Sequence, residues 1–467
     1  MTEQANAAAP RGSGQPLDST VWKVAIVAML GSLLAQLDAT IVNVSLATLA
    51  TDLHASLGTI QWVTSGYLLA LSFALPLNGW LIERLGVKTL YLACFVVFTL
   101  CSALCAFAWS AAALIGFRLL QGASGGLLAP MAQLSMKRAA GPHFTRIAGY
   151  AAAPVLLGPI LGPVIAGAIL HWASWRWLFL VNLPFGAVAF VLAARFLPQD
   201  RPAHAVRRLD WLGWMLLSPG LALVLYGIAQ LQQPVGAFAG VAGVLALAVF
   251  WLVERRKGDA ALLDLDLFRQ PTFTAATSIQ FLNNGLMFAG QLLVPLFLIQ
   301  ACGFSPATMG WMMAPMGVGM LLIVPLLGRI TALVEERWVA MAGAWLALAS
   351  TLLLGWLAVH GLDVPLLAAA LLLRGIGLGA VGLPAMSLAY ARIDHARLPM
   401  ATTTLNIVQR SGGPIITALC ALFLASALHT HDISIGLNAW AETFLLLAVL
   451  HVFMIAATSQ LPSDQGR

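Results

Sequence analysis

Long apolar segments alternate with short polar ones along almost the whole chain. A window of about 19 residues, close to the length of helix that crosses the hydrocarbon core of a bilayer, detects fourteen of them. The pattern predicts an all-helical integral membrane protein with fourteen transmembrane helices. The segments lie near residues 21–49, 58–82, 89–109, 111–135, 147–171, 175–197, 211–232, 235–253, 273–300, 308–330, 338–358, 364–390, 401–426 and 440–458.

Composition agrees with a membrane protein. Of the 467 residues, 60% are hydrophobic and 9% are charged, whereas soluble domains carry about 25% charged residues. The first twenty residues are polar and lack the basic, apolar and cleavage-site order of a signal peptide. We therefore expect a short disordered tail before the first span.

Basic residues indicate the orientation. Of the 24 Lys and Arg residues, all but Arg118, Arg176, Arg374 and Arg410 lie in the tails and alternate loops on one face of the predicted membrane. By the positive-inside rule that face is cytoplasmic, and both termini lie on it. The same bias accounts for the net charge of +6, so the charge requires no nucleic-acid partner.

A weak internal repeat divides the chain. Arg118 opens a glycine-rich segment that ends near Pro130, and Arg374 opens another that ends near Pro384. Each lies in the fourth span of a six-span half if the seventh and eighth spans are set aside. Those two spans carry no charge, so we expect them at the periphery, outside any translocation path. The predicted parts are a cytoplasmic tail, a six-helix bundle, two inserted helices, a cytoplasmic linker, a second six-helix bundle and a cytoplasmic tail, at 1–20, 21–198, 199–258, 259–272, 273–460 and 461–467.

One carboxylate lies well inside an apolar segment. An acid such as Asp38 costs roughly 2.5–3.5 kcal/mol at the centre of a bilayer, so it is a candidate for function. Arg118 is the most plausible buried partner. An arginine favours the ionised acid and burial favours the neutral one, so the pair makes a tunable proton site. A purely structural ion pair is the alternative.

Several motifs resemble those of one transporter family. The run Leu-Asp-Ala-Thr-Ile-Val-Asn-Val at 37–44 is similar to the first-helix signature of the fourteen-span drug/proton antiporters of the major facilitator superfamily, the EmrB/QacA type. The resemblance covers nearly the whole chain. It implies the major facilitator fold, with two six-helix bundles plus two extra helices and substrate bound between the bundles. Further landmarks follow in the expected order, at 60–69, 118–126, 158–163, 175–179 and 262–273.

The resemblance implies roles for particular residues. Asp38 would carry the proton, and Arg118 and Gln121 would adjust its binding. The loop from Gly79 to Lys88 is similar to the superfamily's cytoplasmic latch, although Glu83 replaces the usual Asp and Val87 a usual base. Enforcement of topology by its basic residues is the alternative. The predicted gate residues are Gly79, Glu83, Arg84, Gly86 and Lys88.

A further motif repeats small residues every four positions in 158–166, which gives a smooth face for close helix packing, and its prolines let the helix bend. In the family this motif separates exporters from importers, while packing alone is the alternative. The residues are Gly158, Pro159, Gly162 and Pro163.

Polar residues follow one face of two predicted helices, from Gln280 to Gln291 and from Thr402 to Gly413. Such a stripe either joins helices or lines a water-filled cavity. Aromatic residues in the predicted spans offer an adaptable surface for binding apolar compounds. The predicted cavity residues are Gln61, Trp62, Tyr67, Gln280, Asn284, Met287, Gln291, Asn406 and Gln409.

Together these features favour a proton-coupled multidrug exporter of the cytoplasmic (inner) membrane, with the bilayer, protons and small lipophilic compounds, cations among them, as its partners. The sequence contains no phosphate-binding glycine loop and no catalytic cluster, so we expect no enzyme activity, no ATP and no cofactor. His429 and His431 are too weak a pair to predict a metal site. Export of amphipathic weak acids or fatty acids is an alternative, and a non-transporting membrane sensor is another. The need for a periplasmic adaptor stays open.

Overall fold

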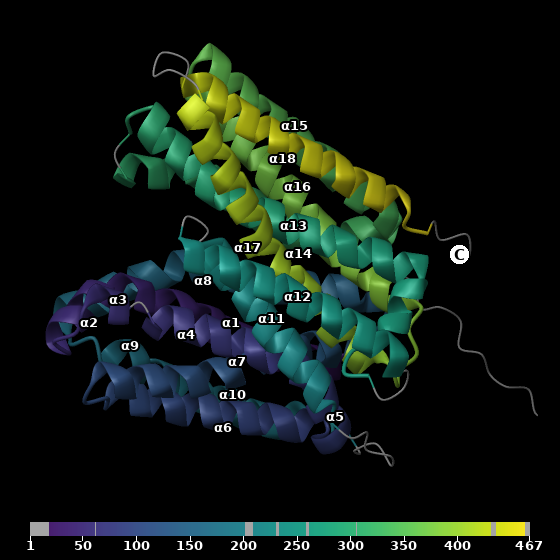
Figure 1. Ribbon diagram of the computed structural model, residues 1–467. Coiled ribbons are helices and arrows are strands. Elements are labelled where there is room, and N and C mark those ends of the chain that lie inside the picture. The colour runs from purple at the N-terminus through teal and green to yellow at the C-terminus, as the bar shows by residue number, and fades with distance from the viewer. Residues whose placement is uncertain are drawn as a thin grey trace, which may run out of the picture.

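The computed structural model describes residues 18–60, 62–200, 209–229, 233–257, 261–304, 306–430 and 436–462. All regular structure in these residues is helical. Figure 1 shows the amino-terminal helices in the lower half of the molecule and the carboxy-terminal helices in the upper half. Residues 1–17 and 463–467 of the predicted tails, 1–20 and 461–467, lie outside the described residues, while Ser19 and Thr20 already belong to the first helix.

The amino-terminal half runs from α1 to α10 and agrees with the first six predicted spans. The span predicted at 21–49 is interrupted, because α1 ends at Ile41 and a short 3-10 turn follows. Its elements are α1 (Ser19–Ile41), η1 (Val42–Ser45), α2 (Leu46–Asp52), α3 (Leu57–Ile60), α4 (Trp62–Ala74), η2 (Leu75–Leu77), α5 (Asn78–Leu85), α6 (Val87–Ala106), α7 (Ala111–Ala140), η3 (Gly141–His143), α8 (Phe144–Trp172), α9 (Trp177–Leu180) and α10 (Asn182–Phe196).

The inserted hairpin and the carboxy-terminal half follow. The hairpin consists of α11 (Trp211–Ala229) and α12 (Pro234–Lys257), and the short helix η5 (Leu265–Arg269) lies in the linker. The second half comprises α13 (Pro271–Leu296), a π-helical turn η6 (Phe297–Ala301), α14 (Pro306–Leu333), α15 (Glu336–His360), α16 (Val364–Ala391), α17 (Leu398–Thr430) and α18 (Gly436–Ser459).

Twelve helical segments in the described part are long and apolar enough to cross a membrane. The two remaining predicted spans fall on α8, where the side chains of 152–164 are not described, and on α11, whose apolar stretch Trp211–Val224 is shorter. The all-helical membrane fold is therefore confirmed, and the count of fourteen transmembrane helices stays a prediction.

Glycines bring α4 and α7 into close contact. A Cβ atom at Gly122 would meet the backbone carbonyl of Tyr67, and one at Gly126 would meet that of Leu71. Small residues four positions apart let two helix backbones approach in this way. The glycine-rich segment after Arg118 therefore places Tyr67 beside the arginine. In the other half, Gly375 packs equally closely on the Met316 carbonyl of α14.

The two halves touch at the end of the molecule that the sequence predicts to be cytoplasmic. Asn78 Nδ2 donates to Thr403 Oγ1 over 3.3 Å, and Asn406 Nδ2 donates to Gln133 Oε1 over 2.7 Å. Gly79 lies against Met400. In Figure 1 the ribbons of the two halves diverge away from this end. The structure is therefore closed on its predicted cytoplasmic side.

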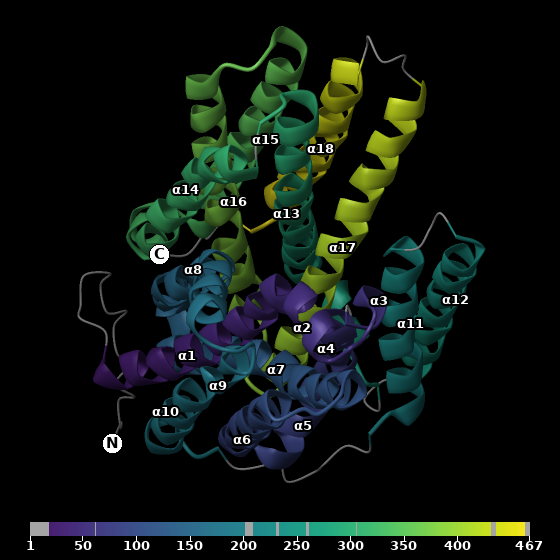
Figure 2. The ribbon, with the colours of Figure 1, turned by 90° about the vertical axis from the view of Figure 1, so that its left-hand side faces the viewer.

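The hairpin of α11 and α12 contacts both halves. Trp214 Nε1 and Ser218 Oγ both donate to the carbonyl of Phe73 on α4, over 3.1 and 3.0 Å. Leu217 of α11 belongs to the same apolar cluster as Ile407 of α17. Figure 2 shows the hairpin standing beside α4 and α17. The outer face of α12 is exposed, as expected at a periphery, but α11 also bridges the halves.

Candidate functional site

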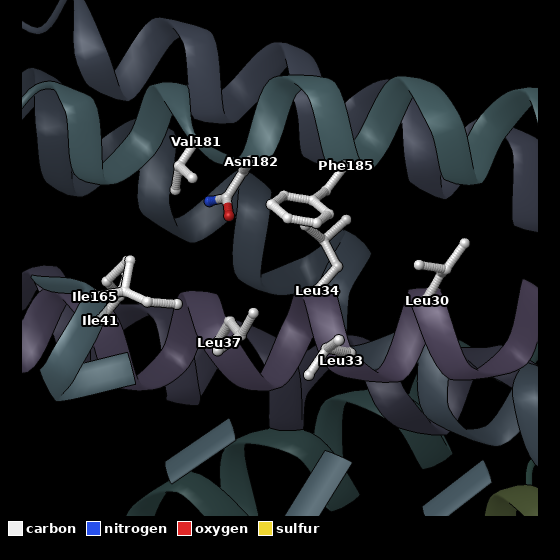
Figure 3. Close-up of a pocket in the computed structure, with 9 residues that line it drawn as sticks. All are labelled: Leu30, Leu33, Leu34, Leu37, Ile41, Ile165, Val181, Asn182 and Phe185. Carbon is white, nitrogen blue, oxygen red and sulfur yellow. The ribbon is translucent and has the colours of Figure 1, made fainter. Parts of the chain in front are cut away.

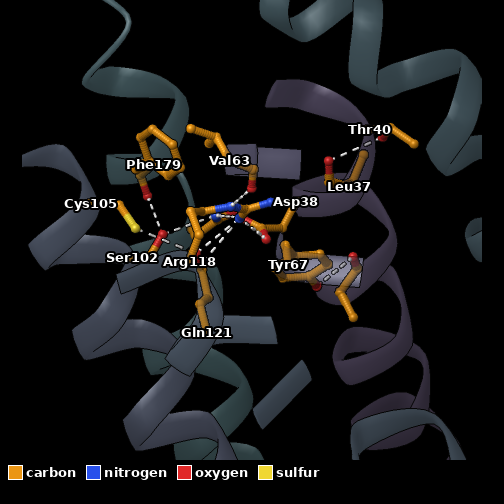
Figure 4. Close-up of polar contacts among 12 residues, drawn as sticks. Leu37, Asp38, Thr40, Val63, Tyr67, Ser102, Cys105, Arg118, Gln121 and Phe179 are labelled. Carbon is orange, nitrogen blue, oxygen red and sulfur yellow. Dashed lines mark hydrogen bonds and ion pairs between the residues drawn. The ribbon is translucent and has the colours of Figure 1, made fainter. Parts of the chain in front are cut away.

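Asp38 and Arg118 form a fully buried ion pair at the centre of the amino-terminal half. Arg118 Nη1 lies 2.6 Å from Asp38 Oδ2, and neither side chain has any exposed surface. Figure 4 shows the two groups meeting between α1 and α7. A buried ion pair must recover the solvation that both charges lose, and it does so through further hydrogen bonds. The surrounding residues provide them.

Two amides complete the surroundings of the carboxylate. Gln121 Nε2 donates to Asp38 Oδ1 over 3.1 Å, and Asn182 Nδ2 donates to the same oxygen over 2.7 Å. Among the described residues, the partners of this carboxylate, Arg118, Gln121 and Asn182, are thus all hydrogen-bond donors. A donor group can bind the ionised acid, but it cannot accept the hydrogen bond that a protonated acid would donate. The arrangement therefore suits the carboxylate form of Asp38.

The arginine is held as firmly as the acid. Its Nε donates to the carbonyl of Val63 over 3.1 Å, and its Nη1 also donates to Gln121 Oε1 over 2.9 Å. The guanidinium carbon lies 4.1 Å from the centre of the Tyr67 ring. Arg118 and Gln121 are three positions apart on α7, so one helix face carries both. Nη2 of Arg118 has no partner within the described structure.

Asn182 and Ser102 belong to this network, although neither is among the site residues predicted from the sequence. Asn182 Nδ2 also donates to Ser102 Oγ over 3.1 Å, and Ser102 Oγ donates to the carbonyl of Phe179 over 2.9 Å. The one available signal was that Asn182 interrupts an apolar run two residues before Pro184. That signal does not reveal which buried group the amide binds.

A small pocket adjoins the network between α1, α8 and α10 (Figure 3). Its volume is about 50 Å³, which exceeds the roughly 10–15 Å³ that one water molecule requires. Asn182 is the polar member of its lining, so the pocket adjoins the group that binds Asp38. The lining residues are Leu30, Leu33, Leu34, Leu37, Ile41, Ile165, Val181, Asn182 and Phe185.

Comparisons with known proteins agree with this architecture. Residues 28–214 match the family model of the Major Facilitator Superfamily. Over 417 residues the chain is 32% identical to the multidrug resistance protein B homolog of Mycobacterium tuberculosis (strain ATCC 25618 / H37Rv). The aligned region covers 87% of this chain and 77% of the relative. The chain belongs to the major facilitator superfamily. It is also 34% identical over 352 residues to the putative multidrug resistance protein MdtD of Salmonella typhi, with coverage of 73% and 74%.

Solved structures of the superfamily share the fold. The human organic anion transporter MFSD10 has a TM-score of 0.63 at 20% identity, over 94% of this chain and 100% of that one. A double tryptophan mutant of XylE has a TM-score of 0.67 at 12% identity, over 97% and 98%. At these identities the likeness concerns the fold alone. As a superfamily member, the chain is a multi-pass membrane transporter of small molecules and not an enzyme.

The loop from Gly79 to Lys88, which the sequence predicts to be the cytoplasmic latch, makes most of its contacts inside the amino-terminal half. Gly86 has a φ of 78°, a conformation that glycine adopts without strain. This turn lets Asp200 accept from the backbone N–H groups of Val87 and Lys88 over 2.8 and 3.3 Å. Lys88 Nζ donates to the carbonyl of Leu197 over 2.8 Å.

Two other predicted gate residues, Glu83 and Arg84, lie on α5. The guanidinium of Arg84 lies over the ring of Trp80, 5.3 Å from its centre. Gly79, which packs on Met400, brings this loop to the carboxy-terminal half. Of the predicted gate residues, Gly79 thus contacts the other half, while Gly86 and Lys88 attach the loop to the segment that follows α10.

The predicted cavity residues separate into two groups. Gln280 is buried and donates to the carbonyl of Gly382 over 2.9 Å, so it joins α13 to α16. Asn406 is buried and joins the two halves. Trp62 and Gln291 are exposed, whereas Tyr67 is buried under Arg118. Three further residues are half-buried, namely Asn284, Met287 and Gln409.

Some predicted residues cannot be placed in detail. Gln61 lies outside the described residues. The exporter motif, Gly158, Pro159, Gly162 and Pro163, lies on α8 in the segment whose side chains are not described. Its role stays a prediction. The structure adds that α8 packs closely on α14, because Gly149 lies against the carbonyl of Val324.

Proposed function

We propose that this transporter is a proton-coupled multidrug exporter of the cytoplasmic membrane, which moves lipophilic compounds outward in exchange for protons. The observation that carries the proposal is the buried pair of Asp38 and Arg118, whose carboxylate is surrounded by donors. The names of its relatives, multidrug resistance proteins, support this substrate class. The distribution of basic residues supports a cytoplasmic location for both termini.

Proton binding would change this site because it turns one carboxylate oxygen of Asp38 from a hydrogen-bond acceptor into a donor. A protonated Asp38 has a hydrogen to donate, while its present partners also donate. At least one contact must therefore break when the proton binds. Two-state elements of this kind link a charge change to a conformational change.

A structural path leads from the ion pair to the cytoplasmic contact. Tyr67, which lies under Arg118, is on α4, and α4 continues through η2 into α5. Asn78 and Gly79 at the start of α5 touch Thr403 and Met400 of α17. Loss of the ion pair would allow α4 to move relative to α7. Because α4 continues into α5, this movement would open the contact between the halves. The half-buried face with Asn284 and Gln409 then offers a surface for substrate.

The energy available is adequate. One proton that enters through about 100 mV and one pH unit releases roughly 3.7 kcal/mol. This sustains a gradient of several hundred-fold for a neutral substrate. A monovalent cation exchanged one for one gains from the pH difference alone, which sustains about tenfold.

The test uses purified protein in proteoliposomes with an imposed pH gradient and ethidium as the probe. The native chain should move ethidium saturably and dissipate the gradient, whereas Asp38→Asn should bind ethidium without gradient-driven movement. Full gradient-driven transport by Asp38→Asn would remove Asp38 from the mechanism. Binding without flux by the native chain would instead support a sensor.

One observation favours the second candidate, export of amphipathic weak acids. Arg410 of α17 is half-buried and has no hydrogen bond or ion pair among the described residues. It lies close enough to Tyr67 of the opposite half to interact with it electrostatically. Asp38 is already paired with Arg118. An unpaired cation between the halves would attract the carboxylate of an anionic substrate.

Salicylate flux in the same proteoliposomes tests this candidate. Arg410→Gln should reduce saturable salicylate transport more than ethidium transport, and Arg410→Lys, which keeps the charge, is the matched control. Equal effects of Arg410→Gln on both probes would exclude a charge-reading role.

A further inference from the structure

The orientation of the Asn182 amide follows from counting hydrogens. Ser102 has a single hydroxyl hydrogen and donates it to the carbonyl of Phe179, which can only accept. Ser102 Oγ must therefore accept from Asn182, and the group that faces it is the amide nitrogen. The same nitrogen faces Asp38 Oδ1. Ser102 thus sets Asn182 as a donor to the carboxylate.

Gln121 is held as a donor in a different way. Its Oε1 accepts from Arg118 Nη1 and from the Cys105 thiol, and its Nε2 donates to Asp38. Inversion of this amide would turn its N–H groups toward the guanidinium, which has hydrogens and no acceptor. Gln121 therefore has to remain a donor as long as Arg118 stays in place.

Asn182 is free of that restriction. If its amide inverts, its oxygen faces both Asp38 and Ser102. Ser102 can then turn its hydroxyl hydrogen from the Phe179 carbonyl to this oxygen, because a hydroxyl both donates and accepts. Asn182 also lines the pocket between α1 and α10, so the side chain has adjacent space in which to turn. Of the two amides on Asp38 Oδ1, this one can become an acceptor.

We propose that Asn182 is a positioning residue that inverts its amide when Asp38 takes up a proton, donating to the carboxylate and accepting from the protonated acid. Ser102 is the partner that makes both orientations possible. The one covalent change is the transfer of a proton from hydronium to Asp38, which leaves water. The two hydrogen bonds of Asn182 to Asp38 and Ser102 reverse direction, and the Ser102 hydroxyl gives up its bond to the Phe179 carbonyl. The inference deepens the proposed function, because it rests on Asp38 as the proton carrier.

Infrared difference spectroscopy on the purified full chain tests the inversion without a transported substrate. The protonated carboxyl band of Asp38 is identified by its loss in Asp38→Asn, and the side-chain amide band of Asn182 by its loss in Asn182→Leu. We expect the amide band to shift with pH at the same midpoint as the carboxyl band. An amide band that stays constant while the carboxyl titrates would overturn the proposal.

The size of the midpoint shift gives a second readout, with Gln121→Leu as the comparison. Loss of Gln121 removes a donor that binds the ionised form, so the midpoint should rise by about one pH unit, a tenfold change. Loss of Asn182 removes a partner of both forms, so the rise should be smaller, about threefold. A rise for Asn182→Leu that equals or exceeds that of Gln121→Leu would show that Asn182 acts as a donor alone.

Ser102→Ala separates the inversion from a folding effect, because it leaves Asp38, Arg118 and Asn182 in place. Without the hydroxyl the amide is no longer set as a donor, and the midpoint should rise. An unchanged midpoint in this variant would contradict the role of Ser102. If the carboxyl and amide bands titrate together but Asp38→Asn still exports with the pH gradient, the inversion stands and the proposed proton coupling fails.

Discussion

Arg118 and Arg374 occupy matching places in the two halves, and their partners differ. Arg118 binds the carboxylate of Asp38. Arg374 is equally buried, but it donates to the carbonyl of Leu286 and to Thr351 Oγ1, over 2.7 and 2.8 Å, and makes no ion pair in the described part of the chain. Its guanidinium lies against Gly290, where a Cβ atom would collide with it.

The difference shows how a repeated scaffold can give its halves different tasks. Both halves keep a buried arginine on a glycine-rich helix, which joins that helix to its neighbours. The amino-terminal half adds an acid, which exchanges the proton under the proposed function. In the carboxy-terminal half the arginine binds a carbonyl and a hydroxyl, which do not titrate in the physiological range. Its role is to hold α13, α15 and α16 together.

The largest effect should come from removing the arginine that has a charged partner. Arg118→Ala leaves Asp38 buried and unpaired, so we expect a loss of about 3–5 kcal/mol in stability together with loss of gradient-driven export. Arg374→Ala strands no charge and should cost about 1–3 kcal/mol. Thermal unfolding in detergent measures both. An active Arg118→Ala variant of native stability would mean that this arginine faces water.

The double variant Asp38→Asn/Arg118→Gln sharpens the comparison. It removes both charges, so it should be about 2–3 kcal/mol more stable than Arg118→Gln alone, and it should still lack proton coupling. Unfolding and ethidium flux are measured on the same preparations. If the double variant is no more stable than the single one, the two groups are not energetically coupled.

Gly290→Ala tests the carboxy-terminal site. The added methyl group pushes the Arg374 guanidinium from its place, so we expect a loss of about 1–3 kcal/mol with the pH profile of export unchanged. Gly116, whose Cβ position meets no atom within 4 Å, provides the matched control Gly116→Ala. A changed pH profile in Gly290→Ala would mean that the second half also takes part in proton exchange.

The smallest effects should come from a feature that the two halves share. Lys88 Nζ donates to Leu197 at the end of α10, and Arg337 Nη2 donates over 2.9 Å to Ser459 at the end of α18. Lys88→Ala and Arg337→Ala should each cost about 0.5–1.5 kcal/mol, and export should fall less than in Arg118→Ala. A complete loss of export in one variant alone would give that loop a gating role beyond attachment.

Much of the fold was predictable because burial in lipid constrains the sequence strongly. Apolar length located the helices, and the cost of a lone acid selected Asp38. The partners of that acid were harder to identify. Arg118 was expected because it too lies in a span, while Asn182 was missed because buried amides serve equally well as links between helices. Gln280 illustrates the two uses of a polar stripe, since its amide joins α13 to Gly382 of α16, while its place in a cavity stays a prediction.

The hairpin of α11 and α12 has a consequence for shortening the chain. Trp214 and Ser218 both bind the Phe73 carbonyl, close to where α4 gives way to η2 at Leu75, beside Pro76. In lipid no water replaces such donors, and an unsatisfied carbonyl there costs several kcal/mol. A shortened version made by deleting 209–257 would thus expose a break in the helix that leads to the contact between the two halves. It would need a new donor at that carbonyl.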